Sequence, residues 1–402
     1  MEIVHAEKRQ KRSCGSMKVA LISHEGGGIS SVSAGLAQSL SKKKIDTTIF
    51  TGTHLYPYQT RKLNDYLDIT YLPTPNFPPR HIWFQALHFT KLLNRFKDYS
   101  IIHGMSPNAS FAFSFFKKRL AKPFVATIHD DQRANLRNFV NQPASSWTLA
   151  DVGFFVLEFP IYDLPAGQIL TASDHITFCS NSILNQIETY RALDYNKVSV
   201  IYNGINFEEI ESEKDQSADY ENHISIIWAG RLYWSKGIMF LLEAFKRAKK
   251  ENRNLNLRIF GTGPLAQKVE KFIMNSGLSD SASFMGYVTH KRLIAEIKRS
   301  HMVVFPSLAE AQPMFVLEAM ACKKPVLAFD LPFAREIVTN MDNGLLAKKG
   351  DIEDLTRKIC LLASDESLRR KLGEAAYNHV KKSHNWDIQA EKYLAVYRSV
   401  GT

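Results

Sequence analysis

Two short apolar runs that flank a loop and a helix constrain the fold of this chain more than any other feature. Residues 302–305 (MVVF) and 325–329 (PVLAF) are typical of buried parallel strands. Between them, residues 314–321 have the composition of a helix, and Pro313 stands where we expect the first helical residue. Proline suits that position because its missing N–H would have no intrahelical partner. The segment therefore predicts an α/β domain with a parallel sheet.

Two carboxylates in the same segment indicate the kind of ligand. Glu310 lies in the loop and Glu318 lies on the helix. Free N–H groups at a helix start attract anions, phosphate above all, and here those of Met314 and Phe315 remain available after Pro313. A carboxylate beside a phosphate is unfavourable unless it binds something else, and sugar hydroxyls fit that role. The segment predicts a site for a nucleotide sugar.

A second strand-to-helix loop carries two basic residues. Residues 224–229 read as a strand, and residues 237–249 as a helix. Arg231 and Lys236 lie in the loop between them, at the carboxyl end of the strand. An arginine fork and a lysine point charge neutralise a diphosphate well, so we expect both residues to bind one. The alternative is a pair of solvated loop charges.

A glycine-rich turn opens the first half of the chain. An apolar strand at residues 17–23 is followed by Gly26, Gly27 and Gly28, after which a helix is expected from Ile29 onward. Glycines allow backbone to approach a ligand closely. The spacing is not G-x-G-x-x-G, so a dinucleotide is not indicated. A tight turn without a ligand is the alternative.

Two histidines lie on predicted strands of the first half. His103 belongs to residues 101–104 and His129 to residues 123–130. Ligands of open α/β sheets gather at the carboxyl ends of strands, so both histidines are candidates, although an isolated histidine is more often structural. The remaining histidines are interpreted as incidental. His129 is followed by two aspartates but without D-x-D spacing, and we predict no metal site.

The pattern E-x7-E, followed by AMA, PVLAFD, REIV and NGLL, resembles family 4 of the retaining glycosyltransferases, which have the GT-B fold. That fold has two Rossmann-like, doubly wound parallel-sheet domains with a donor cleft between them. The resemblance extends from about residue 18 to the C-terminus and is most specific over residues 228–346. The family often has Phe-Gly where this chain has Gln312-Pro313, and Gly where it has Cys322.

The resemblance implies retaining transfer of a hexosyl group from a nucleoside-diphosphate sugar to an acceptor hydroxyl. The acceptor would be a glycan, a lipid-linked sugar or a small molecule, and neither a cofactor nor a metal would be needed. The implied roles are contact with the donor sugar for His129, the ribose for Glu318, and the base for the backbone near Tyr287 and Val288. The glycine loop would close over the donor phosphates, and Glu310 would stabilise the cationic sugar ring in the transition state.

Two other functions remain open. One is a catalytically silent subunit that binds nucleotide sugars, suggested by Gln312-Pro313. The other is a different enzyme with the GT-B fold, such as a nucleotide-sugar epimerase, because fold alone does not separate these activities. Formation of a glycosylated product distinguishes the enzyme from the silent subunit.

The length of 402 residues predicts two domains with separate cores. The expected division, in chain order, is a disordered extension at 1–16 (with Met17 as an alternative start), an acceptor-side domain at 17–205, a linker at 206–223, a nucleotide-sugar-binding domain at 224–385, and a helix at 386–402 that crosses back onto the first domain.

Charge and cysteine usage set the expected location and partners. The formal net charge is +11, but no nucleic-acid-binding motif accompanies it, so we expect no nucleic acid partner. The apolar runs are shorter than the roughly 20 residues needed to span a bilayer. Four cysteines without C-x-x-C spacing indicate reduced thiols and a cytoplasmic location.

Two aromatic and basic stretches, at residues 77–97 and 111–122, allow two interpretations. Each is a helix that packs its aromatic side on the sheet, or a surface that docks on an anionic membrane or a lipid-linked acceptor. The residues concerned are Arg80, Trp83, Phe84, Lys91, Arg95, Lys97, Lys117, Lys118 and Arg119. Peripheral contact with the inner membrane face is thus a further expectation.

Overall fold

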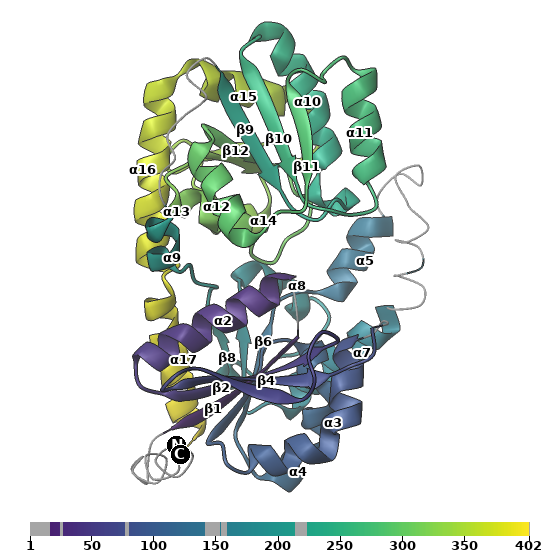
Figure 1. Ribbon diagram of the computed structural model, residues 1–402, viewed down its shortest axis with the longest axis vertical. Helices are drawn as coiled ribbons and strands as arrows, with labels where there is room; N and C mark the ends of the chain where they lie inside the picture. The colour runs from purple at the N-terminus through teal and green to yellow at the C-terminus, as the bar shows by residue number, and fades with distance from the viewer. Residues whose placement is uncertain are drawn as a thin grey trace.

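The protein consists of two α/β domains stacked one above the other (Figure 1). The structure is a computed structural model that describes residues 17–24, 27–76, 80–140, 153, 159–213 and 223–401. The expected extension at residues 1–16 and Gly26 lie outside these residues.

In the described part of the chain, the first domain contains an eight-stranded sheet with the strand order β3-β4-β2-β1-β5-β6-β7-β8. All neighbouring strands are parallel except β3 and β4, which pair antiparallel. The strands are β1 (Lys18–His24), β2 (Asp46–Thr53), β3 (Gln59–Asn64), β4 (Leu67–Pro73), β5 (Ile101–Gly104), β6 (Phe124–Ile128), β7 (His175–Phe178) and β8 (Val198–Val200).

The second domain contains, among the described residues, a six-stranded parallel sheet with the order β11-β10-β9-β12-β13-β14. The strands are β9 (Ile224–Ala229), β10 (Leu255–Phe260), β11 (Ala282–Gly286), β12 (Met302–Phe305), β13 (Val326–Phe329) and β14 (Leu345–Ala347). The chain runs outward from β9 in one direction and returns to β12 on its other side. Strands β9 and β12 thus flank the point where the order reverses, which is where open α/β sheets bind ligands.

Helices cover both faces of each sheet, so the doubly wound α/β architecture expected from the sequence is confirmed. They are α2 (Gly27–Lys42), α3 (Arg80–Phe96), α4 (Pro107–Leu120), α5 (Gln132–Val140), α7 (Phe159–Ala172), α8 (Asn181–Glu188), α9 (Phe207–Ser212), α10 (Ile238–Glu251), α11 (Ala266–Asn275), α12 (His290–Arg299), α13 (Met314–Ala321), α14 (Pro332–Arg335), α15 (Ile352–Ser364), α16 (Glu366–Ser383) and α17 (Trp386–Val400).

The alternation of side chains along the strands divides the core of the first domain between the two faces of its sheet. On β1, Ala20 and Ile22 pack in one cluster, and Val19 and Leu21 pack in the other. Successive residues of a strand point to opposite faces, and a strand covered on both faces reads as a continuous apolar run. This is why the sequence of β1 could be recognised as a buried strand.

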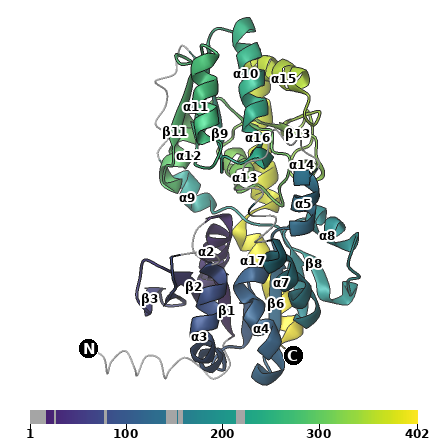
Figure 2. The same cartoon turned by 90° about the vertical axis from the view of Figure 1, so that its right-hand side faces the viewer.

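Helix α17 completes the first domain, although it lies at the end of the chain (Figure 2). Its Trp386 packs so closely that a Cβ added to Gly35 of α2 would lie 2.0 Å from the indole Nε1, and one added to Gly204 would lie 2.7 Å from the Trp386 Cα. Two glycines therefore make room for the tryptophan where the chain returns from the second domain.

The interval 206–223, expected to be a linker, begins with a helix that belongs to the second domain. Phe207 and Ile210 of α9 are buried in the same cluster as the residues of β9 and β12. At its other surface, α9 faces the first domain, where Glu208 forms an ion pair with Lys42 of α2. Helix α9 thus lies at the joint between the two domains.

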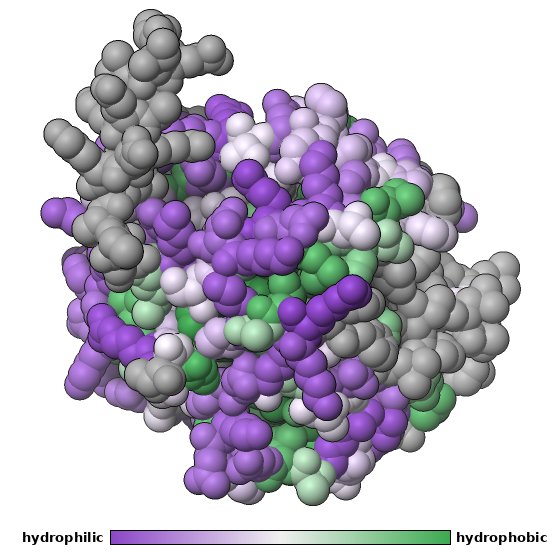
Figure 3. All heavy atoms as spheres, turned by 90° about the horizontal axis from the view of Figure 1, so that it is seen from below, coloured by the Kyte–Doolittle hydropathy of each residue, from purple (hydrophilic) through white to green (hydrophobic). Residues whose placement is uncertain are grey.

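One aromatic residue of α3 and one of α4 pack inside the first domain. Phe96 of α3 and Phe113 of α4 are buried, and their ring centroids are 4.7 Å apart. From below, the surface of this domain is mostly hydrophilic with smaller hydrophobic patches (Figure 3). Among the described residues, the structure contains no helix that combines the length and the apolar character needed to cross a membrane.

Candidate active site at the domain interface

The loops that follow β9 and β12 are held against each other. Gly237 has a φ of +68°, and a Cβ at this position would lie 1.7 Å from the carbonyl oxygen of Pro306, so only glycine fits. The N–H of Leu308 donates to the carbonyl of Ser235 at 2.7 Å, and the Ser307 hydroxyl oxygen lies 3.0 Å from the same carbonyl oxygen. The two loops therefore form one rigid support for the side chains that they carry.

Lys236 and Glu310, one from each loop, form an ion pair. The Lys236 Nζ lies 2.5 Å from the Glu310 Oε1, and the Ser307 hydroxyl donates to the same oxygen at 2.9 Å. The two side chains are only 16% and 11% exposed. Lys236 was expected on a diphosphate and Glu310 on a sugar. Since the two groups touch, a phosphate that binds Lys236 would lie beside Glu310.

Arg231 is the second basic residue of the β9 loop, and its side chain is exposed. Its guanidinium carbon lies 5.4 Å from the centre of the Tyr233 ring. Within the described residues, no carboxylate forms an ion pair with it. Arg231 is therefore available to bind an anion.

Helix α13 begins at Met314, as its composition predicts, and Pro313 directly precedes it. Pro313 has the extended ψ of 107° and is the N-cap residue, so its placement as the first helical residue was wrong. Its carbonyl accepts from the N–H groups of Val316 and Leu317. The N–H groups of Met314 and Phe315 precede these first intrahelical bonds and remain the donors at the helix start.

Glu318 lies one turn further along α13 and is 8% exposed. Its Oε1 lies 3.0 Å from the Nε2 of His290, the first residue of α12, and the other ring nitrogen of His290 lies 3.3 Å from Glu209 of α9. The hydrogen bond with Glu318 raises the pKa of His290 to about 9. His290 was interpreted as incidental; the structure places its ring between two carboxylates, and its raised pKa makes it a cation at neutral pH.

The residues expected to lie near the base follow β11, on the same turn as His290. Gly286 has a φ of +68°, Tyr287 is 76% exposed and Val288 is half-buried. The Thr289 hydroxyl then caps α12 by accepting from the N–H of Arg292. The backbone after Gly286 and the imidazole of His290 are therefore neighbours along the chain.

The two candidate histidines of the first domain differ in their hydrogen bonding. His129 follows β6, is 9% exposed, and among the described residues has no hydrogen-bond partner for its Nε2. Burial, with a smaller contribution from His24, lowers the pKa of His129 to about 4, so its ring is neutral.

His103, by contrast, is a structural residue. Its ring nitrogens lie 2.7 Å from the hydroxyls of Tyr397 and Thr127, and it is fully buried. Burial lowers its pKa to about 3. These bonds attach α17 to the sheet, and His103 does not join the candidate site.

The helix that follows the glycine turn after β1 begins earlier than the sequence predicts. Helix α2 begins at Gly27, two residues before Ile29. Gly28 is exposed, and a Cβ added to it would meet nothing within 4 Å. Crowding within the protein therefore does not require glycine at position 28, and its role at a ligand stays a prediction.

Several contacts join the two domains next to these residues. The Gln312 Oε1 accepts from the backbone N–H of Asn203 at 2.6 Å. The Glu336 carboxylate accepts from the N–H groups of Asn181 and Ser182, at 2.8 and 2.6 Å, where α8 begins. The loop that carries Glu310 is thus tied to the first domain.

The comparisons with known families agree with this architecture. The model described as Glycosyl transferases group 1 matches residues 209–379, and the model described as Glycosyltransferase Family 4 matches residues 26–209. The chain belongs to the family 4 type of glycosyltransferases.

Known relatives of this glycosyltransferase cover almost its whole length. An uncharacterised glycosyltransferase of Methanocaldococcus jannaschii is 24% identical over 399 residues, which is 95% of this chain and 98% of the relative. Sucrose-phosphate synthase from Thermosynechococcus elongatus has a TM-score of 0.76 at 18% identity, covering 96% and 99% of the two chains. Anabaena HepE has a TM-score of 0.72 at 15% identity, covering 95% and 100%. These structures establish the GT-B fold.

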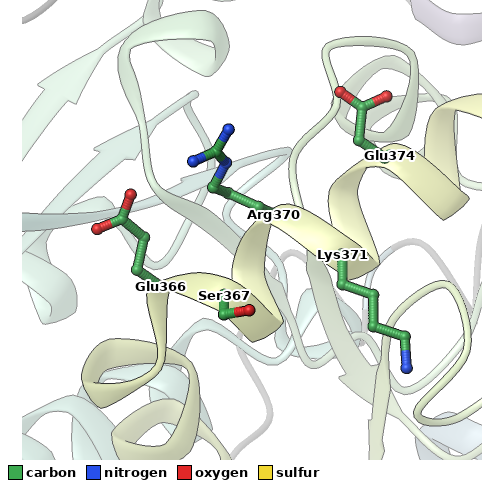
Figure 4. A pocket seen from close by; sticks show the side chains of 5 residues that line it. All are labelled: Glu366, Ser367, Arg370, Lys371 and Glu374. Atoms are coloured by element: carbon green, nitrogen blue, oxygen red, sulfur yellow. The ribbon is translucent and has the colours of Figure 1, made fainter.

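Two hollows on this glycosyltransferase are lined by residues other than the predicted donor residues. One is a shallow surface depression along α16, lined by Glu366, Ser367, Arg370, Lys371 and Glu374 (Figure 4). The other is a cavity of about 10 Å³ beside the end of β6, roughly the space of one water, whose lining includes Asp130, Tyr190 and Arg191. Among the described residues, no group of three or more His, Cys, Asp or Glu is arranged to hold a metal ion.

Proposed function

We propose that this glycosyltransferase transfers a hexosyl group from a nucleoside-diphosphate sugar to an acceptor hydroxyl, with retention at the anomeric carbon. The observation that carries the proposal is the meeting of Lys236 and Glu310 at the end of β9 and β12, beside the start of α13. A diphosphate needs positive charge and backbone donors, and a sugar ring that becomes cationic needs a carboxylate. The two joined loops after β9 and β12 carry these groups close together.

Donor binding would use the second domain. Arg231, Lys236 and the N–H groups of Met314 and Phe315 would hold the diphosphate, because arginine forks, ammonium groups and helix starts all favour phosphate oxygens. Glu318 would accept hydrogen bonds from the ribose hydroxyls. The backbone at Tyr287 and Val288 would contact the base.

Catalysis would depend on where charge develops. In the transition state the sugar ring resembles an oxocarbenium ion while the leaving diphosphate gains negative charge. Lys236 would then move its interaction from Glu310 toward the phosphate, which leaves the carboxylate to stabilise the cationic ring. The acceptor proton would pass to the donor phosphate, as the family resemblance implies, and neither a metal nor a cofactor would take part.

The first domain would supply the neutral side of the site. The His129 Nε2 is buried without a partner among the described residues, and the ring is uncharged at neutral pH. A sugar hydroxyl would give this nitrogen its missing hydrogen bond.

The relatives support the substrate classes. HepE of Anabaena was solved with UDP and glucose. A Campylobacter jejuni relative, 29% identical over 219 residues, is named as an N-acetylgalactosaminyltransferase that acts on a diphospho-undecaprenol sugar. These names motivate a nucleotide-sugar donor and a glycan or lipid-linked acceptor for this chain.

Two measurements test the proposal. Thermal-shift assays with UDP, GDP, ADP and their sugars should reveal the base, because a ligand that binds the folded state raises its stability. Labelled donor and candidate acceptors should then give a product with the anomeric configuration of the donor. Binding without product would support a silent subunit, and conversion of the donor without acceptor would support an epimerase. An inverted product would contradict retention, and loss of activity in EDTA would contradict a metal-free reaction.

We further propose a cytoplasmic protein with peripheral membrane contact through α3 and α4. Arg95, Lys97, Lys118 and Arg119 are exposed there, whereas Lys117 pairs with Asp174 at 2.5 Å. Basic side chains near an anionic bilayer contribute about 1 kcal/mol each. The protein should therefore sediment with anionic vesicles at low salt and be released at high salt. Equal, negligible binding to anionic and neutral vesicles would contradict this contact.

A further inference from the structure

We infer that His290 is a positioning residue for the donor nucleotide, which holds the Glu318 carboxylate for the ribose and is itself held by Glu209. The inference rests on the proposed nucleotide-sugar site and adds two residues to it. Neither residue belongs to the E-x7-E pattern.

The geometry links three helices. The imidazole of His290, at the start of α12, lies with Nε2 3.0 Å from Glu318 on α13 and with Nδ1 3.3 Å from Glu209 on α9. The Glu318 side chain is 11% exposed, while those of His290 and Glu209 are 46% and 51% exposed. The arrangement therefore runs from the solvent side of α9 to the inner face of α13.

The chemistry of Glu318 requires such a partner. An ionised carboxylate only accepts hydrogen bonds, and it is costly to bury without a donor or a positive charge. His290 provides both to Oε1. The other carboxylate oxygen, Oε2, is then left for ribose hydroxyls, and the cation reduces the repulsion between Glu318 and the donor diphosphate.

The charged groups around His290 maintain its protonated form. Glu318 and Glu209 face the ring, and the hydrogen bond with Glu318 is the largest cause of its raised pKa of about 9. Its neighbours on α12 are directed elsewhere: Lys291 pairs with Glu213, and Arg292 pairs with Glu296. Both ring nitrogens of protonated His290 can therefore donate, one to each carboxylate.

The test compares nucleotide binding by the wild type and His290→Gln. Titrations with UDP, GDP and ADP first identify the diphosphate that the full-length wild-type protein binds. His290→Gln should weaken binding of that nucleotide about 10- to 100-fold, the usual range for a lost hydrogen bond to a charged group. The donor KM should rise with little change in kcat, because a ribose contact is the same in the ground and transition states.

Nucleotides that lack a ribose hydroxyl give a sharper test. If His290 acts through Glu318 on the ribose, the loss caused by His290→Gln should shrink for the 2′-deoxy or the 3′-deoxy form of the same diphosphate. The wild type should also lose affinity as the pH rises through about 9, the pKa of His290, whereas the variant should show a flatter profile in this range.

Lys291→Gln is the matched control, because Lys291 is the next residue of α12 and its side chain is 78% exposed. It should bind the nucleotide as the wild type does. Should His290→Gln fail to fold, Glu209→Gln takes its place and should weaken binding two- to threefold and lower the pH midpoint. Unchanged affinity and pH profile in the folded variants would overturn the inference. A wild type that binds none of the three diphosphates would instead overturn the proposed function itself.

Discussion

His129 lies in the first domain and His290 in the second, and their surroundings move their pKa values in opposite directions. Burial lowers the pKa of His129 to about 4, whereas the hydrogen bond with Glu318 raises that of His290 to about 9. At neutral pH the first domain therefore presents an uncharged ring, and the second domain presents a cation between two carboxylates. The difference matches a site that receives a neutral sugar on one side and a charged nucleotide on the other.

Charged groups of the second domain are paired, whereas several neutral buried groups are not. In the second domain, Lys236 is paired with Glu310, and His290 with Glu318. Within the described residues, the His129 Nε2 and the Asn203 Oδ1 of the first domain are buried and unpartnered, and so is the Gln312 Nε2 of the second domain. A donor must exchange interactions with the paired groups, whereas it can only add hydrogen bonds to the unpartnered ones. Each unpartnered buried group costs about 1–3 kcal/mol until it is satisfied.

The largest expected effect lies on the second-domain side. Lys236→Ala should lower turnover about 10²-fold or more, because it removes charge that stabilises the leaving phosphate. Glu310→Gln should lower turnover by a similar factor while donor affinity is kept or improved, since Lys236 is then released for the phosphate. Steady-state kcat and donor KM measure both.

Lys250→Ala, on the exposed side of α10, is the control for Lys236→Ala and should behave as the wild type. If turnover were unchanged in both Lys236→Ala and Glu310→Gln, the paired groups of the second domain would be purely structural. The contrast between the two domains would then have no catalytic meaning.

The free energy of unfolding should depend on pH in opposite ways through His129 and His290. The unfolded chain protonates His129 near pH 6.5, but the folded protein does so only near pH 4, so unfolding takes up protons between these values and the free energy of unfolding falls as the pH drops. The loss for His129 is on the order of 3 kcal/mol. His290 has the opposite sign: its contribution is fully present below pH 6.5 and is lost as the pH rises through about 9.

Urea unfolding across the pH range measures the loss of stability at acid pH and at alkaline pH. His129→Phe should reduce the acid slope, and His290→Gln should reduce the alkaline slope. Since His103 and His384 are also buried with pKa values lowered to about 3, part of the acid slope should remain in His129→Phe. An acid slope that His129→Phe leaves unchanged would contradict the neutral, buried state of His129.

A smaller effect is expected for catalysis by His129. In His129→Phe, turnover should fall roughly tenfold, the upper range for a single hydrogen bond to a neutral group. Stability at neutral pH should be unchanged or higher, because an unsatisfied nitrogen is removed from a buried position. His175→Phe, a partly buried histidine that bonds Ser199 on β8, serves as the control with normal turnover. A destabilised variant with normal turnover would reverse the assignment of His129.

The sequence predicted the second-domain side better than the first. The apolar runs of β9 and β12 bound the loops that carry Arg231, Lys236 and Glu310, and parallel strands bring such loops to one edge. Periodicity does not relate residue 290 to residue 318, so the pairing of α12 with α13 required the tertiary structure. Strand β3 was missed because its side chains are all exposed and mostly polar, without alternation.

His103 and His129 show the same limit in the first domain. Both lie on or after neighbouring strands, and nothing in their local sequence separates them. The difference comes from Tyr397, 294 residues after His103, which covers one histidine and not the other. A helix that returns from the far end of the chain therefore gives His103 a hydrogen-bond partner, while the His129 Nε2 has none among the described residues.

The smallest effect is expected for a contact between the two domains. Its removal tests whether this contact, rather than the charged and neutral groups of the site, controls activity. Glu336 of the second domain accepts from two N–H groups at the start of α8 in the first domain. Such a carboxylate at a helix start contributes about 0.3–1 kcal/mol, so Glu336→Gln should lower kcat/KM by no more than about fivefold. Glu208→Gln is the matched control, because Glu208 pairs with Lys42 across the same interface but is 76% exposed and should have no measurable effect. If Glu336→Gln were as damaging as Lys236→Ala, closure of the two domains would limit the reaction, and the opposite states of His129 and His290 would matter less than the contact that brings them together.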